Sequence, residues 1–159
     1  MKWDNTYKVL MEYGVALRDE YRHNLIKNDR FTQNHTLIDS VKVVIKKDDL
    51  HIALYLQLAD YWKYVEYDTR PHFPPPQAIE SWIKAKPIIP DGKNGKLPTT
   101  KQLSYLIGRK ISREGTKGTH DLREAQSSVY EDFKEAIGKA LLKDVADQIH
   151  LLVLNLRLD

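Results

Sequence analysis

The chain has 159 residues, of which 42% are hydrophobic and 30% charged, and its formal net charge is +3. This composition is typical of a globular protein and excludes a disordered chain, and the length suits a single domain, residues 1–159. Cysteine is absent, which excludes disulfides and thiolate metal sites and suits a reducing compartment or a virion assembled in one.

The first predicted elements are a long helix and a hairpin. Apolar residues recur at alternating spacings of four and three from Trp3 to Leu25, so we predict an amphipathic helix over residues 3–28. Gly14 lies on its apolar stripe and lowers helix propensity by about 1 kcal/mol, so we expect another element to pack closely across it. Residues 37–60 alternate between apolar and polar side chains, which predicts an antiparallel hairpin with one face on this helix.

The next segment, residues 61–76, combines aromatic residues with three consecutive prolines. Alternation predicts that residues 61–67 continue the second strand and place Trp62 and Tyr64 on the same face. That face can pack against the first helix or against another subunit, because Trp and Tyr are frequent interface anchors. The candidate subunit-interface residues are Trp62, Tyr64, Glu66, Tyr67, Pro74, Pro75, Pro76 and Trp82.

Helices are predicted over residues 76–86, 100–114 and 128–148. Pro76 suits a first helical turn, and Gly115 suits a helix end. Leucines alternate with other residues over 149–158, which predicts a third strand that joins the hairpin. The predicted fold class is therefore α+β, with the N-terminal helix packed on a small antiparallel or mixed sheet.

The third predicted helix and the loop after it carry a concentration of positive charge. Between residues 101 and 117 there are five basic residues and one acidic residue, Glu114. This segment can contact DNA or an acidic neighbouring protein, or it can be a solvated helix face. The candidate contact residues are Lys101, Arg109, Lys110, Arg113 and Lys117.

No pattern of catalytic residues occurs in the sequence. No two of the six histidines are closer than twelve residues, so local zinc-binding spacing is missing. Residues 92–97, GKNGKL, lack the spacing of a phosphate-binding loop, and there is no Gly-x-Ser-x-Gly motif. We expect no enzymatic activity, cofactor or metal; a hydrolase would need a metal or acid pair assembled from distant residues.

No apolar run approaches the roughly 20 residues of a membrane span, and the N-terminus lacks the apolar run of a signal peptide. We therefore expect a protein made in the cytoplasm with no membrane contact.

Two blocks of sequence resemble a known family. Residues 61–69, YWKYVEYDT, are similar to the YAxYVEFGT stretch of neck and tail-completion proteins of tailed bacteriophages. Residues 73–83, FPPPQAIESWI, and 102–116, QLSYLIGRKISREGT, resemble that family's PPxxAIxxWIxxK and AxxIARKIxREGT segments. The resemblance covers about residues 61–118, with Asp68 at a position where the family often has glycine and Gly108 where it has alanine.

The resemblance implies a minor structural protein of the virion, assembled in the host cytoplasm. Such a protein would form a homo-oligomeric ring in the neck, join the portal to the tail, and line or seal the DNA channel. Its partners would be the portal and other neck and tail proteins, with non-specific contact to packaged DNA. The alternative from the residues themselves is a small nucleic-acid-binding regulator that uses residues 101–117.

Overall fold

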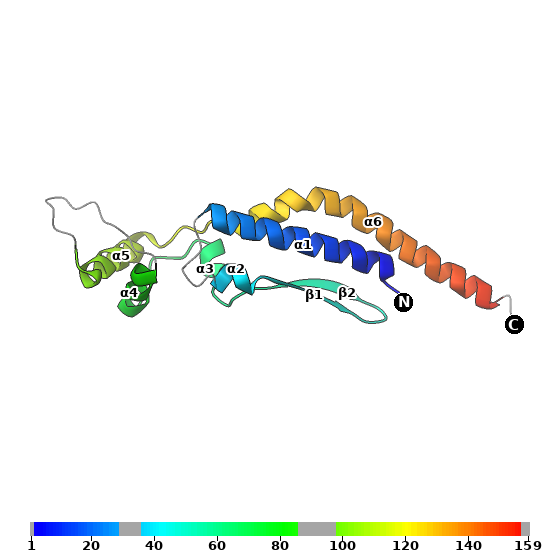
Figure 1. Cartoon of the computed structure of the whole chain (residues 1–159), viewed down its shortest axis with the longest axis horizontal. Helices are drawn as coiled ribbons and strands as arrows, with labels where there is room; N and C mark the ends of the chain where they lie inside the picture. Colours follow the sequence, from blue (N-terminus) through cyan, green and yellow to red (C-terminus); the bar gives the residue numbers. More distant parts are fainter. Residues whose placement is uncertain (1, 29–35, 86–97, 157–159) are drawn as a thin grey trace.

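The computed structural model describes residues 2–28, 36–85 and 98–156, which form an elongated molecule (Figure 1). In the described residues the strands form one two-stranded antiparallel sheet and most of the remainder is helical, so the predicted α+β class is confirmed. In chain order the elements are α1 (Asp4–Lys27), α2 (Thr36–Ser40), β1 (Lys42–Lys47), β2 (Ile52–Gln57), α3 (Trp62–Glu66), α4 (Pro76–Ala85), α5 (Thr100–Glu114) and α6 (Asp121–Leu156).

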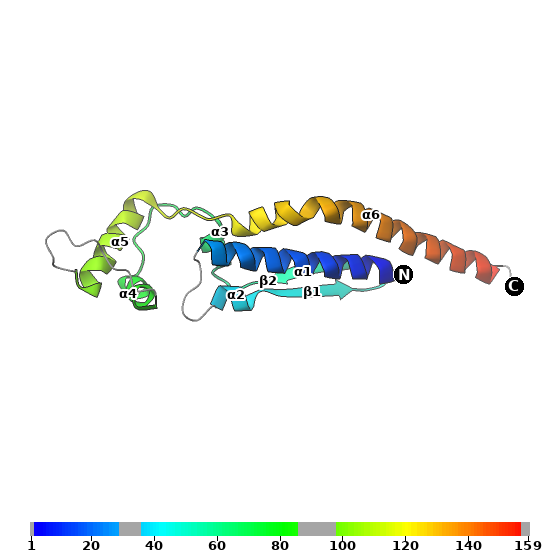
Figure 2. The same ribbon diagram turned by 45° about the horizontal axis from the view of Figure 1, so that its top comes forward.

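The body of the molecule has three layers, with α1 between the β1–β2 hairpin and α6 (Figure 2). The hairpin pairs in register from Lys42 opposite Gln57 to Lys47 opposite Ile52. It crosses α1 at Gly14, where an added Cβ would lie 2.5 Å from Cγ1 of Val43 and 2.6 Å from Cδ1 of Leu54. The close packing predicted across Gly14 is therefore confirmed.

The core lies at the end of the body where α1 finishes and α6 begins. Leu17, Tyr21 and Leu25 of α1 are buried there against Ala125 of α6 and Val41, which precedes β1. Burial of each large apolar side chain contributes about 1.5–3 kcal/mol to folding. This cluster holds α1, the base of the hairpin and α6 together.

Residues 67–85 and 98–120 form what we call the arm, whose helices α4 and α5 lie beyond one end of the body (Figure 1). The two helices pack on each other through buried residues such as Ile79 and Ile83. A Cβ at Gly108 of α5 would lie 3.1 Å from the Phe73 ring, which accounts for glycine at this position. As predicted, α5 covers residues 100–114, and Thr99 caps it by accepting a hydrogen bond from the Gln102 backbone N–H.

The predicted strand over residues 149–158 is wrong up to residue 156, because α6 continues as a helix to Leu156; residues 157 and 158 lie outside the described residues. Helix 128–148 was also predicted too short, since α6 begins at Asp121. After Gly138 the helix contains neither glycine nor proline to end it, and leucine is a strong helix former. In an almost entirely apolar run, period-two alternation does not distinguish a strand from a helix.

The prediction that residues 61–67 extend the second strand is also wrong, because Trp62–Glu66 form α3. The hairpin itself is shorter than residues 37–60, since Thr36–Ser40 are helical and β2 ends at Gln57. The backbone N–H groups of Trp62 and Tyr64 each donate to the carbonyl three residues back, those of Ala59 and Tyr61, in this turn. The chain therefore turns away from the sheet and carries its aromatic residues toward the arm.

Candidate assembly surfaces

Glu66 lies at the base of the arm and is internal, contrary to its prediction as a subunit-interface residue. Only 3% of the surface of Glu66 is exposed to solvent. One carboxylate oxygen, Oε2, accepts a hydrogen bond from the Leu122 backbone N–H at 2.9 Å, and Oε1 accepts one from the Arg123 N–H at 3.1 Å. Glu66 thereby satisfies the first turn of α6, where a negative charge is favoured by the helix dipole.

A buried polar cluster surrounds this helix start. The Asp121 carboxylate accepts hydrogen bonds from Asn28 and Thr119, and its backbone carbonyl accepts one from the Asn24 amide at 3.1 Å. Burial raises the pKa of the neighbouring Tyr21 phenol, and the negative charges of Glu66 and Asp121 raise it further. The cluster thus joins the end of α1, through Asn24 and Asn28, to the start of α6 at Asp121. We therefore assign it a structural role.

Two extended segments connect the arm to the body, and they are bonded to each other at Thr69 and Thr116. The Thr69 N–H donates to the Thr116 carbonyl at 2.9 Å, and the Thr116 N–H donates to Oγ1 of Thr69 at 3.0 Å. Gly115 follows α5 with a φ of 71°, and a Cβ there would collide with the Thr69 carbonyl oxygen. The two connecting segments are thus paired with each other at the base of the arm.

The predicted aromatic and proline residues divide between the interior and the surface. Trp62 is half-buried and packs against the core cluster, so it faces the protein's own body. Tyr64 points the other way and is 65% exposed. Exposed residues of the set are Tyr67, Pro75, Pro76 and Trp82, while Pro74 is half-buried.

The predicted basic residues are all exposed. Lys101, Arg109 and Arg113 share one row of α5 with Tyr105, each separated by four residues or a multiple of four. None of these three cations has a charged partner among the described residues. By contrast, Nζ of Lys110 lies 4.0 Å from Oε2 of Glu114. Lys117 lies outside the helix, on the segment that returns to the body. The structure therefore presents a row of three unpaired cations with an aromatic ring between them.

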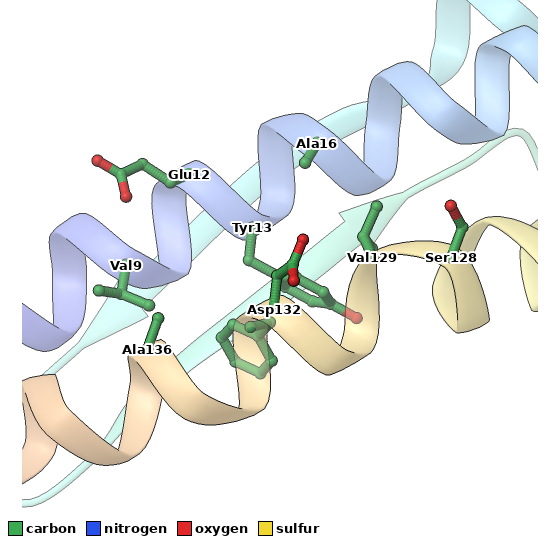
Figure 3. Close-up of a pocket in the computed structure, with 9 residues that line it drawn as sticks. Val9, Glu12, Tyr13, Ala16, Ser128, Val129, Asp132 and Ala136 are labelled. Atoms are coloured by element: carbon green, nitrogen blue, oxygen red, sulfur yellow. The ribbon is translucent and has the colours of Figure 1, made fainter.

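A groove of about 420 Å³ lies between α1 and α6, and the sequence patterns did not predict it. Its floor includes the stacked rings of Tyr13 and Phe133, whose centroids are 4.0 Å apart. Figure 3 shows Asp132 and Tyr13 between the two helices, with Glu12 extending outward from α1. Both carboxylates are exposed, and neither has a hydrogen-bond or ion-pair partner within the described part of the chain.

The C-terminal half of α6 carries a further exposed surface, which is apolar. In the first half of this helix the outer face holds ion pairs such as Lys134 with Glu131 at 2.6 Å. Beyond Gly138 the same face becomes apolar, and Leu142 at its start is 73% exposed. The other exposed apolar residues here are Leu141, Val145, Ile149, Leu151, Leu152, Val153 and Leu154.

Charge is distributed unevenly between the arm and the body, and this signal could have pointed to the groove from the sequence. Residues 67–120 contain ten Lys or Arg and four Asp or Glu, a net charge of +6. The rest of the chain contains fifteen basic and eighteen acidic residues, a net charge of −3. The small overall charge therefore results from two oppositely charged parts.

Within residues 2–28, 36–85 and 98–156 there is no group of three His, Asp or Glu side chains placed to hold a metal ion. No helix among these residues has both the length and the apolar character needed to cross a membrane. A scan against protein-family models, a search of curated proteins and a search of solved structures each found no match to this chain.

Proposed function

We propose that the protein is a structural subunit of a homo-oligomeric ring in the neck of a tailed phage, where it joins the portal to the tail. The observation that carries this proposal is an elongated subunit with unlike exposed surfaces at its two ends. The arm presents aromatic, proline and basic side chains, and the C-terminal half of α6 presents apolar ones. The YVEYDT, PPPQAIESWI and IGRKISREGT segments that resemble neck and tail-completion proteins all lie in or next to the arm.

A closed ring needs two different lateral surfaces on each subunit, because the contact between neighbours is head to tail. Exposed aromatic residues are frequent anchors of such contacts, and contiguous exposed apolar surface marks a site that another molecule covers. A rigid connection between body and arm suits this role, because the arm keeps one orientation in every subunit. The two connecting segments are hydrogen-bonded to each other at Thr69 and Thr116, which restricts their movement relative to two separate tethers.

The test is the oligomeric state of the purified full-length chain. Native mass spectrometry is expected to find one dominant species of defined copy number above two, and negative-stain microscopy is expected to show closed rings. A protein that stays monomeric at every concentration and salt, with or without the portal protein, contradicts the proposal.

The second candidate is a nucleic-acid-binding regulator, which the cation row of α5 favours. Exposed cations along one helix face can contact the phosphates of a DNA duplex. This candidate predicts salt-dependent binding of duplex DNA that is lost when Arg109, Lys110 and Arg113 are replaced by alanine. Binding unaffected by that triple substitution contradicts it.

A further inference from the structure

We propose that the arm of one subunit docks into the α1–α6 groove of the next, with the cation row of α5 against Glu12 and Asp132. This inference names the contact between neighbouring copies and rests on the proposed ring. Its basis is charge complementarity within one chain: the sequence from residue 67 to 120, which includes the arm, has a net charge of +6 and the rest of the sequence −3. Because opposite charges lie on different parts of the same subunit, they can attract only between copies or across a large bend of the arm.

Individual side chains at the groove and on α5 are also opposite in charge. Glu12 and Asp132 at the groove, and Arg109 and Arg113 on α5, are exposed and have no ionic partner among the described residues. By contrast, ion pairs already occupy other charges on the body, for example Glu135 with Lys139 at 2.6 Å. The groove thus carries two carboxylates, and the α5 row two arginines, that have no ion-pair partner among the described residues.

The two surfaces also agree in size and in apolar content. From Tyr105 to Arg113 the row on α5 spans eight residues, or about 12 Å, and the α6 wall of the groove from Ser128 to Ala136 spans the same length. Tyr105 is 59% exposed, and its ring centroid lies 6.4 Å from that of Phe73. The stacked rings on the groove floor offer an aromatic surface for it to contact.

A contact of this kind is heterologous, because the arm surface and the groove surface differ. Repeated from copy to copy, it closes a ring or extends a filament, and it leaves one arm and one groove free in any open chain. A second copy is therefore the occupant that the charges favour over DNA, since DNA would leave Glu12 and Asp132 unmatched.

The first experiment is a charge swap on the full-length chain. Arg109→Glu with Arg113→Glu, and separately Glu12→Lys with Asp132→Lys, are each expected to weaken association at least about tenfold in the concentration dependence of native mass spectra. Combining all four substitutions restores opposite charges and is expected to restore assembly to near the wild-type level. All four positions are exposed, and none has a charged partner within residues 2–28, 36–85 and 98–156, so melting temperatures should stay close to that of the wild type.

The second experiment uses the absence of cysteine from the sequence. A variant with Arg109→Cys and Asp132→Cys should form a ladder of covalent dimers, trimers and larger species on oxidation, while each single variant stays uncrosslinked. A covalent dimer from either single variant indicates a symmetric contact and overturns the inference.

The remaining outcomes separate the inference from the proposed function. If rings persist after either charge reversal and the double-cysteine variant gives no ladder, the ring stands and the arm-to-groove contact is overturned. If Arg109→Glu with Arg113→Glu abolishes DNA binding while the rings stay intact, the row faces DNA and the inference is again overturned. If the wild-type chain forms no oligomer, both the proposed function and the inference fail.

Discussion

Asp144 on α6 caps the first turn of α1, so the substitution Asp144→Asn tests how the two long helices are held together. Its Oδ1 accepts hydrogen bonds from the Asn5 backbone N–H at 3.0 Å and from the Asn5 side-chain amide at 2.7 Å. Its Oδ2 accepts a third from the Thr6 N–H at 2.8 Å. Asp144 and Thr6 are both buried, and 138 residues separate them in the sequence.

The expected loss follows from these three bonds. An asparagine can keep one oxygen toward Asn5 but places an NH₂ group against the buried Thr6 N–H, and an unsatisfied buried donor costs about 1–3 kcal/mol. The two remaining bonds lose their ionic character, which removes roughly half of their strength. We therefore expect the free energy of unfolding to fall by about 2–4 kcal/mol, or a melting temperature lower by roughly 5–12 °C for a chain of this size.

The measurement is urea unfolding followed by circular dichroism, with Asp147→Asn as the control. Asp147 is exposed, lies one turn further along α6 and has no partner among the described residues, so its substitution should change stability by less than about 0.5 kcal/mol. Equal small effects of the two substitutions would refute the assignment of Asp144 as the cap of α1.

The pH dependence gives a second check on the same residue. Burial raises the pKa of the Asp144 carboxyl, but the hydrogen bonds from Thr6 and Asn5 together outweigh burial and hold the pKa below its ordinary value. Because the folded-state pKa is lowered, the stabilisation is complete above the unfolded pKa of about 3.9 and is lost as the pH falls through the folded value. The stability difference between wild type and Asp144→Asn should therefore narrow as the pH falls from about 5 toward 3.

Three further substitutions test the packing. Gly14→Ala should lower the free energy of unfolding by about 1 kcal/mol, because the clash with Val43 outweighs the gain in helix propensity. Gly138→Ala should raise it by about 1 kcal/mol, because no atom lies within 4 Å of the added Cβ. Thermal melts in which both substitutions shift the melting temperature in the same direction would contradict this. Trp62→Ala should lower the melting temperature by several degrees, since its ring packs on the core. Tyr64→Ala should leave the melt nearly unchanged and weaken assembly in native mass spectra, and a melt as low as that of Trp62→Ala would show that this ring is part of the fold.

Periodic segments with clear boundaries were predicted well from the sequence. The helix over residues 3–28 has a regular apolar stripe, and the helix over 100–114 has a capping threonine and a terminal glycine, so both agree with α1 and α5. The C-terminal strand failed because its leucines follow directly from a helix that nothing interrupts. Helix α6 also begins at Asp121, seven residues before the predicted start at residue 128, because Glu66 supplies its cap from a distant part of the chain.

The candidate assembly residues were predicted only in part, for a similar reason. Local sequence identified the aromatic and basic side chains, but whether Trp62 or Tyr64 faces the body depends on how α3 turns against the core. Glu66 was predicted to contact another subunit, but it binds the first turn of α6, which begins more than fifty residues further along the chain. The groove between α1 and α6 joins residues more than a hundred positions apart, and only the opposite charges of arm and body hint at it in the sequence.

The most direct test of the proposed function is to locate the protein in purified phage particles. Antibodies against the chain, coupled to gold and imaged by electron microscopy, should label one position per particle, between head and tail. Quantitative mass spectrometry of the same particles should find several copies in each. Particles that contain none of the protein, while infected cells contain it in quantity, would contradict the account.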